Sequence, residues 1–345
     1  MTTKFALSRA VVRALFTALA AALLYWTWRR TDATLVQSLR QCAIPAMLAA
    51  AALYGLAQLL GAWRWRTLMA VQQMRLGLWT ALKLTLVGNF FSLLIPGAVT
   101  GDLVKIACTA RDFPARAPQI TLVIMLDRAI GLCGIFFAAA IATILCLPGL
   151  LTALDDRSAW PLTLSLLAVN AGCLATVTAY GLFRLLPRCR ICAAFSRRLL
   201  EKLPASLSTP IGHMLQALAL YRGNGRILLR TLLLSICIHL TAAGTVFCIG
   251  RSLGEVSMSL PQYTLVTQLS NVTGLIPATP GGIGLRDAVS ARLLQFFQAS
   301  PLRVCGTIPL VNSLVIIFWG LTGALCYAFT PTLNAPRQPS GAPSP

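Results

Sequence analysis

The sequence is short of charge, and above all of negative charge. Only 11% of its 345 residues are charged, with nine Asp and Glu against 29 Lys and Arg. A soluble domain carries roughly 25% charged residues, so this composition excludes an ordinary water-soluble protein. Hydrophobic residues make up 57% of the chain, which is typical of a polytopic α-helical membrane protein.

Long polar segments are also missing between the apolar runs. Many of these runs reach about 20 residues, the length that crosses the hydrocarbon core as a helix. Two others, Leu78–Val104 and Leu260–Phe297, are interrupted by Pro and Gly. The Pro- and Ser-rich residues 332–345 predict a disordered tail after a single integral membrane domain, 1–331. The uninterrupted runs predict six full spans: Ala10–Trp28, Cys42–Gly61, Ile120–Leu147, Leu162–Leu186, Ile227–Gly250 and Cys305–Phe329.

Side chains suited to catalysis or metal binding are few. The chain has two His and no HExxH, DxD or Ser/His/Asp arrangement, and Cys189–Cys192 has no second Cys pair to complete a metal site. We therefore expect no metal, no cofactor and no enzymatic activity. His239, inside a predicted span, fits either a proton relay or a packed neutral histidine, and the sequence does not decide between them.

The net charge of +20 is placed around the membrane segments rather than in one patch. Basic clusters lie at Arg64–Lys83, Lys105–Arg116 and Arg184–Arg226. The positive-inside rule puts such clusters in the cytoplasm, where they are attracted to anionic headgroups. This distribution favours membrane lipids as partners over nucleic acid.

These clusters predict a topology in which the interrupted stretches are re-entrant. With the N-terminus in the cytoplasm, basic clusters on both sides of Leu78–Val104 require this stretch to dip into the membrane and return, breaking at Ile95–Gly101. The same reasoning makes Leu260–Phe297 enter from the opposite face, breaking at Ile276–Gly284, and returns the C-terminus to the cytoplasm. The predicted fold class is all-α, with six full transmembrane helices and two broken re-entrant hairpins.

The order of these segments predicts an inverted repeat. Each half, about 8–150 and 160–331, reads span, span, broken hairpin, span, and the odd number of full spans turns the second half upside-down. A cytoplasmic basic loop, 184–226, lies within the second half. Inverted repeats with broken helices near the midplane are the plan of many secondary transporters.

The two breaks predict a binding site. Unwound backbone at membrane depth is tolerated only where it is buried in protein or lines a polar cavity. Two hairpin tips that meet near the midplane would enclose such a cavity. Their half-helix N-termini carry partial positive charge, which suits an anion such as a phosphate.

Three of the nine acids lie at or near the breaks, each with a basic neighbour in the sequence. The pairs are Asp102 with Lys105, Asp127 with Arg128, and Asp287 with Arg286. Charges at membrane depth are costly and usually functional, so the pairs fit either substrate or proton handling or structural locks between hairpins and spans. The candidate substrate-binding or coupling residues are Asn89, Pro96, Gly97, Gly101, Asp102, Lys105, Asp127, Arg128, Asn271, Pro277, Pro280, Gly281, Gly282, Gly284, Arg286 and Asp287.

Three segments around these residues have a recognisable pattern. They are Asn89–Pro96 followed by GDLVK at Gly101–Lys105, LDRAIGL at Leu126–Leu132, and PATPGGIGLRD at Pro277–Asp287. With them the chain resembles, over nearly its whole length, the membrane region of the lysylphosphatidylglycerol synthase/flippase family of bacteria and archaea. Asp stands for that family's usual Glu twice and Lys for its Arg once, so charge is kept while the acids reach less far.

The resemblance implies a multi-pass protein of the bacterial inner membrane. Its best-known relatives flip aminoacylated phosphatidylglycerol, so it implies a flippase or transporter that moves or binds an anionic phospholipid or a phosphate-linked polyprenyl lipid. Nothing soluble follows Phe329, so we expect no aminoacyl-transferase domain and no synthesis of lysyl-lipid. Two other hypotheses stay open: an intramembrane lipid-carrier transferase, and a partner of lipid-biosynthesis enzymes that docks through residues 184–226. A homo-oligomer is a further option.

Overall fold

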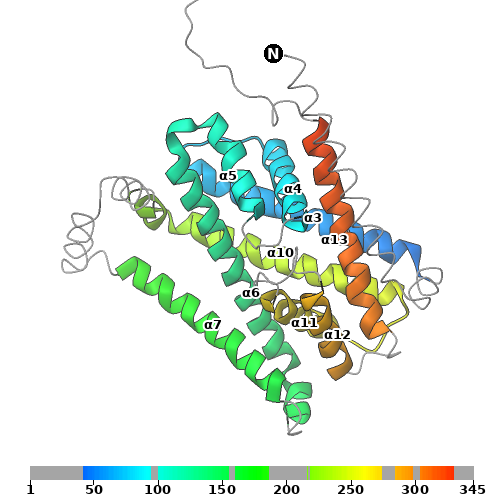
Figure 1. Ribbon diagram of the computed structural model, residues 1–345. Helices are drawn as coiled ribbons and strands as arrows, with labels where there is room; N and C mark the ends of the chain where they lie inside the picture. Colours follow the sequence, from blue (N-terminus) through cyan, green and yellow to red (C-terminus); the bar gives the residue numbers. More distant parts are fainter. Residues whose placement is uncertain are drawn as a thin grey trace, which may run out of the picture.

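The protein is helical throughout the part that the structure describes. In this computed structural model the described residues are 42–94, 100–154, 160–185, 216, 218–273, 284–297 and 304–329. Figure 1 shows long helices crossing one another at steep angles, with shorter helices packed between them. The described ranges contain no strand.

Five described helices are long and apolar enough to cross a membrane, as the sequence predicts for a multi-pass membrane protein. They coincide with five of the six predicted spans, and the remaining one, Ala10–Trp28, lies outside the described residues. Two of the predicted ends are too early. The helix α3 continues past Gly61 to Val71 and so carries Arg64, and α6 continues past Leu147 to Leu154. The five are α3 (Ile44–Val71), α6 (Ala117–Leu154), α7 (Trp160–Leu185), α10 (Gly225–Ser252) and α13 (Val304–Phe329).

Each interrupted stretch forms a pair of short helices. The first pair is α4 (Leu78–Leu94) with α5 (Thr100–Asp112), and the second is α11 (Leu260–Thr273) with α12 (Leu285–Phe296). The two arms of each pair pack against each other.

The predicted breaks fall between the arms, where residues 95–99 and 274–283 lie outside the described part. The prediction was wrong about the end of the first stretch. The helix α5 runs past Val104 to Asp112, so Lys105 lies inside a helix and not in a flanking loop. A short 3₁₀ turn, η1 (Pro114–Arg116), then leads into α6.

The helices pack in a pattern that stays the same when the two halves are exchanged. The helix α3 packs along its counterpart α10, while α4 packs on α13 and α11 packs on α6. The contacts of α3 with α4 and of α5 with α6 recur as contacts of α10 with α11 and of α12 with α13. In Figure 1 the α4/α5 pair lies above α10 and the α11/α12 pair lies below it. An internal two-fold repeat requires pairings of this kind.

Two glycines allow helices to approach closely at the first pair. A Cβ atom at Gly101 would collide with the Gly88 carbonyl and the Ser92 hydroxyl, and one at Gly323 would collide with the Leu86 carbonyl. The first contact joins α5 to α4, and the second joins α13 to α4. Both contacts involve backbone, which cannot move aside as a flexible side chain can.

A methyl group at either position is therefore expected to destabilise the protein. Gly101→Ala and Gly323→Ala should each lower the free energy of unfolding by about 1–3 kcal/mol, the cost of overpacking. Gly306 has nothing within 4 Å of its Cβ position, so Gly306→Ala is a matched control that should be neutral or slightly stabilising. Thermal unfolding in detergent measures all three, and equal melting temperatures would contradict this packing.

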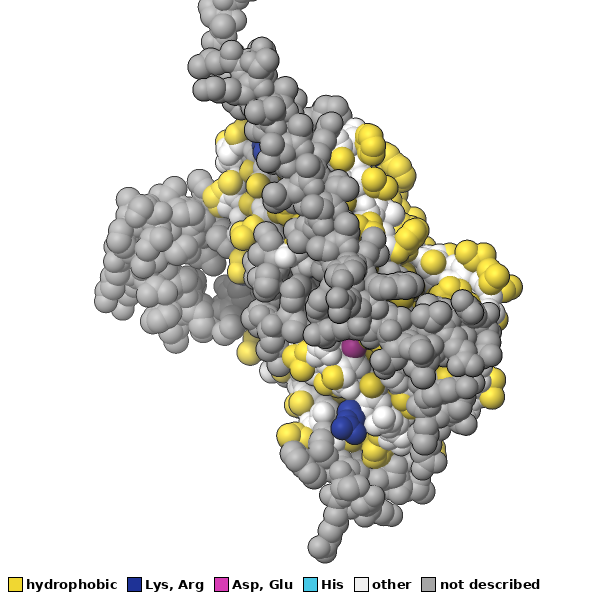
Figure 2. Space-filling view, turned by 45° about the vertical axis from the view of Figure 1, so that its right-hand side comes forward, with side chains coloured by type: hydrophobic (Ala, Val, Ile, Leu, Met, Phe, Trp, Pro, Cys, Tyr) yellow, Lys and Arg dark blue, Asp and Glu magenta, His cyan; other side chains and the backbone are white. Residues whose placement is uncertain are grey.

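The outer surface of the described helices is apolar. Figure 2 shows mainly hydrophobic side chains wherever its face of the molecule is described. On α7, Leu164, Leu167 and Leu174 are 59%, 64% and 69% exposed. An apolar surface of this kind faces lipid in a membrane protein, while polar groups turn inward.

The loop between α10 and α11 is organised around one buried acid, Glu255. Its Oε1 accepts hydrogen bonds from the Ser257 N–H, the Ser257 hydroxyl and the Met258 N–H at 2.6, 2.6 and 2.8 Å. Its Oε2 accepts one from the Tyr263 hydroxyl at 2.7 Å. Burial alone would raise the pKa of Glu255, but these hydrogen bonds favour the carboxylate and hold the pKa below its ordinary value.

This loop predicts an acid-sensitive contribution to stability. Because the folded pKa of Glu255 lies below the unfolded value of about 4.5, the carboxylate stabilises the fold fully above that pH and loses this effect as the pH falls through the folded pKa. The melting temperature should therefore fall more steeply below about pH 4.5 in the wild type than in Glu255→Gln. Parallel curves for the two proteins would show that Glu255 contributes no such linkage.

Candidate functional site

The described helices surround a central cavity of about 540 Å³. All the helices named above except α7 contribute side chains to its wall. Both short pairs reach it, through Thr85, Asn89 and Lys105 on one side and Thr267, Asn271 and Arg286 on the other. The volume lies in the range of about 300–1,000 Å³ that small-molecule sites occupy.

Positive charge dominates the cavity wall. Arg64, Lys105, Arg128 and Arg286 line it from four different helices, whereas Asp127 is the one acid among its described lining residues. Charges are weakly screened in such an interior, so each cation there needs a partner.

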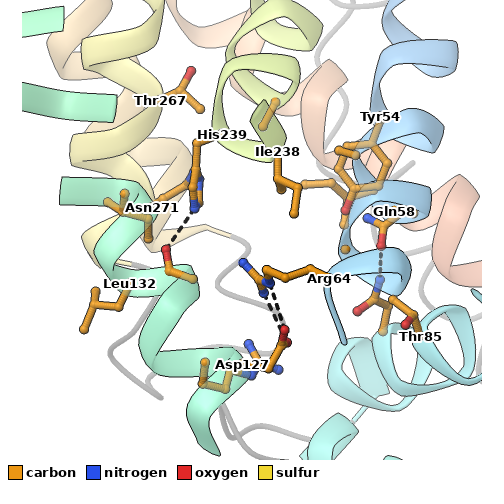
Figure 3. Close-up of a pocket in the computed structure, with 18 of the residues that line it drawn as sticks. Tyr54, Gln58, Arg64, Thr85, Asp127, Leu132, Ile238, His239, Thr267 and Asn271 are labelled. Atoms are coloured by element: carbon orange, nitrogen blue, oxygen red, sulfur yellow. Dashed lines mark hydrogen bonds and ion pairs between the residues drawn. The ribbon is translucent and has the colours of Figure 1, made fainter. Parts of the chain in front are cut away.

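Arg64 and Asp127 form a buried ion pair that joins α3 to α6. The Arg64 Nε and Nη2 atoms donate to the two Asp127 carboxylate oxygens at 2.8 and 3.1 Å, as Figure 3 shows. The side chains are 11% and 13% exposed. Arg64 Nη1 also donates to the Ser235 hydroxyl at 2.9 Å, and that hydroxyl donates to the Ile130 carbonyl at 3.1 Å. The guanidinium thus ties α3, α6 and α10 together at the cavity wall.

A second ion pair joins α5 to α6. The Arg128 Nε and Nη2 atoms donate to the two Asp102 oxygens at 2.6 and 2.9 Å. The Asp102 side chain is 9% exposed and does not line the cavity, while the Arg128 side chain is 56% exposed and does. Bidentate Arg–carboxylate pairs are strong and geometrically specific, so Asp102 fixes Arg128 at the wall.

Asp287 caps the start of α12. Its carboxylate accepts hydrogen bonds from the Gly284 N–H at 3.2 Å and from the Ser313 hydroxyl at 3.0 and 2.8 Å. Arg286 donates to Asp287 at 3.4 Å and to Ser313 at 3.1 Å. Gly284 has φ +96°, a conformation that glycine adopts without strain. The partial positive charge at the N-terminus of α12 is thus balanced by the Asp287 carboxylate in the first turn of the same helix.

Lys105 lacks a carboxylate partner in the described part of the protein. Its ammonium group lies over the Trp65 ring, 5.2 Å from the centroid, in a cation–π contact. Within the described residues the ion pairs are those of Arg64, Arg128 and Arg286. Lys105 is therefore the cavity cation whose charge is least compensated.

Uncharged polar side chains fill much of the remaining wall. The Asn89 side-chain amide donates to the Gln58 side-chain oxygen Oε1 at 2.7 Å, and Figure 3 shows Gln58, Thr85 and Tyr54 on one side of the cavity. His239 Nε2 lies 3.0 Å from the Gly131 carbonyl, which can only accept a hydrogen bond, so this nitrogen carries the proton. The lining residues of this type are Tyr54, Gln58, Thr85, Asn89, His239, Thr267, Asn271 and Asn312.

The comparison with known families now identifies the chain's relatives. The family model described as the lysylphosphatidylglycerol synthase TM region matches residues 10–323. The chain belongs to this family. Membership confirms the resemblance seen in the sequence and gives the protein a role connected with membrane lipids. No curated protein matches the chain.

The structure separates the predicted site residues of this family member into three groups. Gly101 allows α5 to pack closely on α4, and Gly284 lies at the capped start of α12. Asp102 and Asp287 lie outside the cavity lining, and each accepts hydrogen bonds from an arginine that lines it. The predicted residues outside the described part are Pro96, Gly97, Pro277, Pro280, Gly281 and Gly282. Those at the cavity wall are Asn89, Lys105, Asp127, Arg128, Asn271 and Arg286.

Two of the three acids pair with an arginine other than their basic neighbour in the sequence. Asp102 pairs with Arg128 rather than Lys105, and Asp127 pairs with Arg64 rather than Arg128. Asp127 and Arg128 are adjacent on α6, and their side chains point to different partners, Arg64 and Asp102. The third neighbour pair, Asp287 with Arg286, is present at 3.4 Å beside the shorter Ser313 contacts.

The contribution of α3 to the cavity was not predicted from the sequence. Arg64 was expected in a cytoplasmic basic cluster, but it lines the cavity. Tyr54, Ala57, Gln58, Gly61 and Arg64 all reach the cavity, and their spacing is that of one helix face. Such a stripe of polar and small residues along an apolar helix is visible in the sequence and could have predicted that this face of α3 lines a polar cavity.

No cluster of three or more His, Cys, Asp or Glu side chains forms within the described ranges. The guanidinium, ammonium and amide groups that line the described cavity suit the binding of anions and hydroxyl groups.

Proposed function

We propose that this family member is a lipid flippase or transporter. In this proposal it moves an anionic phospholipid or a phosphate-linked polyprenyl lipid between leaflets, holds the headgroup in the central cavity, and leaves the lipid chemically unchanged. The observation that carries the proposal is a cavity lined by Arg64, Lys105, Arg128 and Arg286 in a protein whose described part contains five membrane-length helices.

The cavity's chemistry supports a phosphate-bearing ligand. Arg presents several N–H donors in a fixed fork that matches phosphate oxygens, and Lys acts as a point charge. Arg128 and Arg286 are each held by an acid and can still present donors to the cavity. The partners that follow from this proposal are membrane lipids.

The arrangement of the short pairs supports movement across the bilayer. Both pairs contribute to one cavity, and they lie on opposite sides of α10. If each pair is a re-entrant hairpin from one leaflet, the cavity lies where the two tips approach each other. Rocking of one half against the other would then expose it to alternate sides.

A transport measurement tests the proposal. The purified protein is reconstituted in liposomes whose short-chain fluorescent lipids carry anionic, zwitterionic or phosphate-linked headgroups, and bleaching by a membrane-impermeant reductant reports movement between leaflets. We expect faster movement of anionic lipids than in protein-free liposomes. Protein-independent rates for every lipid would contradict the proposal.

We further propose a bacterial inner-membrane location with both termini in the cytoplasm. This orientation predicts that Arg75, before α4, and Ala115, after α5, face the same side of the membrane. Single cysteines at these positions in a cysteine-free background should react with an impermeant maleimide from the cytoplasmic side, and a cysteine at Val256 from the outside. Labelling of positions 75 and 115 from different sides would contradict re-entry of the first pair.

A further inference from the structure

We propose that the cavity selects headgroups that carry hydroxyl groups and a net negative charge, and excludes headgroups that end in an ammonium group. This inference rests on the proposed function and narrows it. It names phosphoglycerol-like or phosphosugar-like headgroups as ligands and predicts that aminoacylated headgroups bind more weakly. Four observations carry it.

The carboxylates at the cavity are already neutralised. Both Asp127 oxygens accept from Arg64, at 2.8 and 3.1 Å. Both Asp102 oxygens accept from Arg128, and Asp287 is held by Ser313, Gly284 and Arg286. A buried ammonium group needs a carboxylate to balance it, and each described acid near the cavity is engaged with an arginine.

Among the described residues at the cavity wall and directly behind it, the cations exceed the acids by one charge. Three carboxylates balance Arg64, Arg128 and Arg286, which leaves Lys105 with an aromatic ring as its described partner. A phosphodiester carries one negative charge and would balance Lys105. A lysyl ester on the same headgroup adds two ammonium groups and would leave the cavity with an uncompensated positive charge.

The nearby aromatic ring that could bind an ammonium group by a cation–π contact is also already occupied. Ammonium and choline groups bind over aromatic faces, as Lys and Arg side chains do. Behind the cavity wall, the buried Trp65 ring already holds the Lys105 ammonium group 5.2 Å from its centroid. Tyr54 is the aromatic side chain among the described lining residues, so these residues form no aromatic cage.

The rest of the wall matches hydroxyl groups. The amides of Gln58, Asn89, Asn271 and Asn312 each combine donors with an acceptor, as recognition of a hydroxyl requires. Thr85 is 6% exposed, and its hydroxyl has no hydrogen-bond partner in the described structure. The cavity of about 540 Å³ has room for a glycerol or a sugar beside the phosphate.

Equilibrium binding tests this selectivity. The probes are phosphatidylglycerol, its lysyl ester and phosphatidylcholine with identical acyl chains, titrated as radiolabelled lipids into the intact protein in detergent. We expect phosphatidylglycerol to bind at least about 10-fold more tightly than the other two, because their ammonium groups would meet like charge in the cavity. Equal or tighter binding of the lysyl ester would overturn the inference.

Variants of Lys105 show whether the cavity is the source of the preference. Lys105→Glu should remove the preference for phosphatidylglycerol over the lysyl ester, and Lys105→Met should weaken it. Arg292 is exposed on α12 and contacts Gln295, away from the cavity, so Arg292→Glu is the matched charge reversal that should keep the preference. A preference that survives in a folded Lys105→Glu protein would overturn the inference.

Transport in liposomes then separates this inference from the proposed function. If the lysyl ester moves between leaflets as fast as phosphatidylglycerol, the selectivity is wrong and the transport function stands. If phosphatidylglycerol binds selectively but no lipid moves, the selectivity stands and the transport function is wrong.

Discussion

Replacing Asp127 with Ala is expected to lower the free energy of unfolding by about 3–5 kcal/mol, the cost of removing one partner of a buried ion pair. The variant leaves the Arg64 guanidinium, which is 11% exposed, without its carboxylate between α3 and α6. Unfolding in a detergent–denaturant titration measures the loss.

A double variant distinguishes loss of the charge pair from loss of packing. Arg64→Met with Asp127→Leu removes both charges and keeps apolar volume, so it should recover most of the lost stability while remaining defective in transport. If Asp127→Ala is as stable as the wild type, the pair does not hold α3 against α6. If the double variant is less stable than Asp127→Ala, the attraction between the two charges stabilises the fold by more than their desolvation costs.

Replacing Lys105 with Ala is expected to lower the transport rate of an anionic lipid by about 10- to 100-fold, the range for loss of one hydrogen bond to a charged group. The effect should be on transport rather than on folding, because Lys105 makes no ion pair within the described residues. The liposome assay and a thermal unfolding curve on the same preparation measure both quantities.

Conservative and distant variants make this second prediction specific. Lys105→Arg retains the positive charge and should keep most of the rate. Arg292→Ala removes an exposed positive charge from α12 and should leave the rate unchanged. If Lys105→Ala moves lipid at the wild-type rate, the cavity cation is not part of the transport path.

The helices themselves were largely predictable from the sequence. Runs such as Ile227–Gly250 are long and apolar enough that few other structures satisfy their backbone in a membrane, and the structure has a helix at Gly225–Ser252. The interruption of Leu260–Phe297 by Pro and Gly likewise predicted two short helices. Local composition determines these helices and breaks, so they can be predicted from short segments of the sequence.

The boundaries were less predictable where a charge lies inside a helix. The span that ends at Gly61 in the prediction continues to Val71 because Arg64 finds Asp127 and Ser235 on other helices. The same applies to Lys105, which lies over Trp65 instead of in a flanking loop. A hydropathy scale assigns the full cost of a charge to the helix that carries it and cannot include a partner far along the chain.

The sequence indicated several residues that line the cavity, but not which of them pair with one another. The breaks and the scarce acids pointed to Asn89, Lys105, Asp127, Arg128, Asn271 and Arg286, which the structure brings to one cavity. The pairing of Asp102 with Arg128 depends on how α5 packs on α6, and that of Asp127 with Arg64 on how α3 packs on α6. Such contacts follow from tertiary packing, which the spacing of neighbours in the sequence does not contain.

The most direct test of a lipid headgroup in the central cavity is photo-crosslinking. A phosphatidylglycerol analogue with a photoreactive group on its glycerol headgroup is activated in liposomes with the wild-type protein, and adducts are mapped by mass spectrometry. We predict adducts on cavity peptides that carry Asn89, Lys105 or Asn271, reduced by excess unlabelled phosphatidylglycerol. Adducts confined to lipid-facing surface such as α7, or unaffected by competitor, would contradict binding in the cavity.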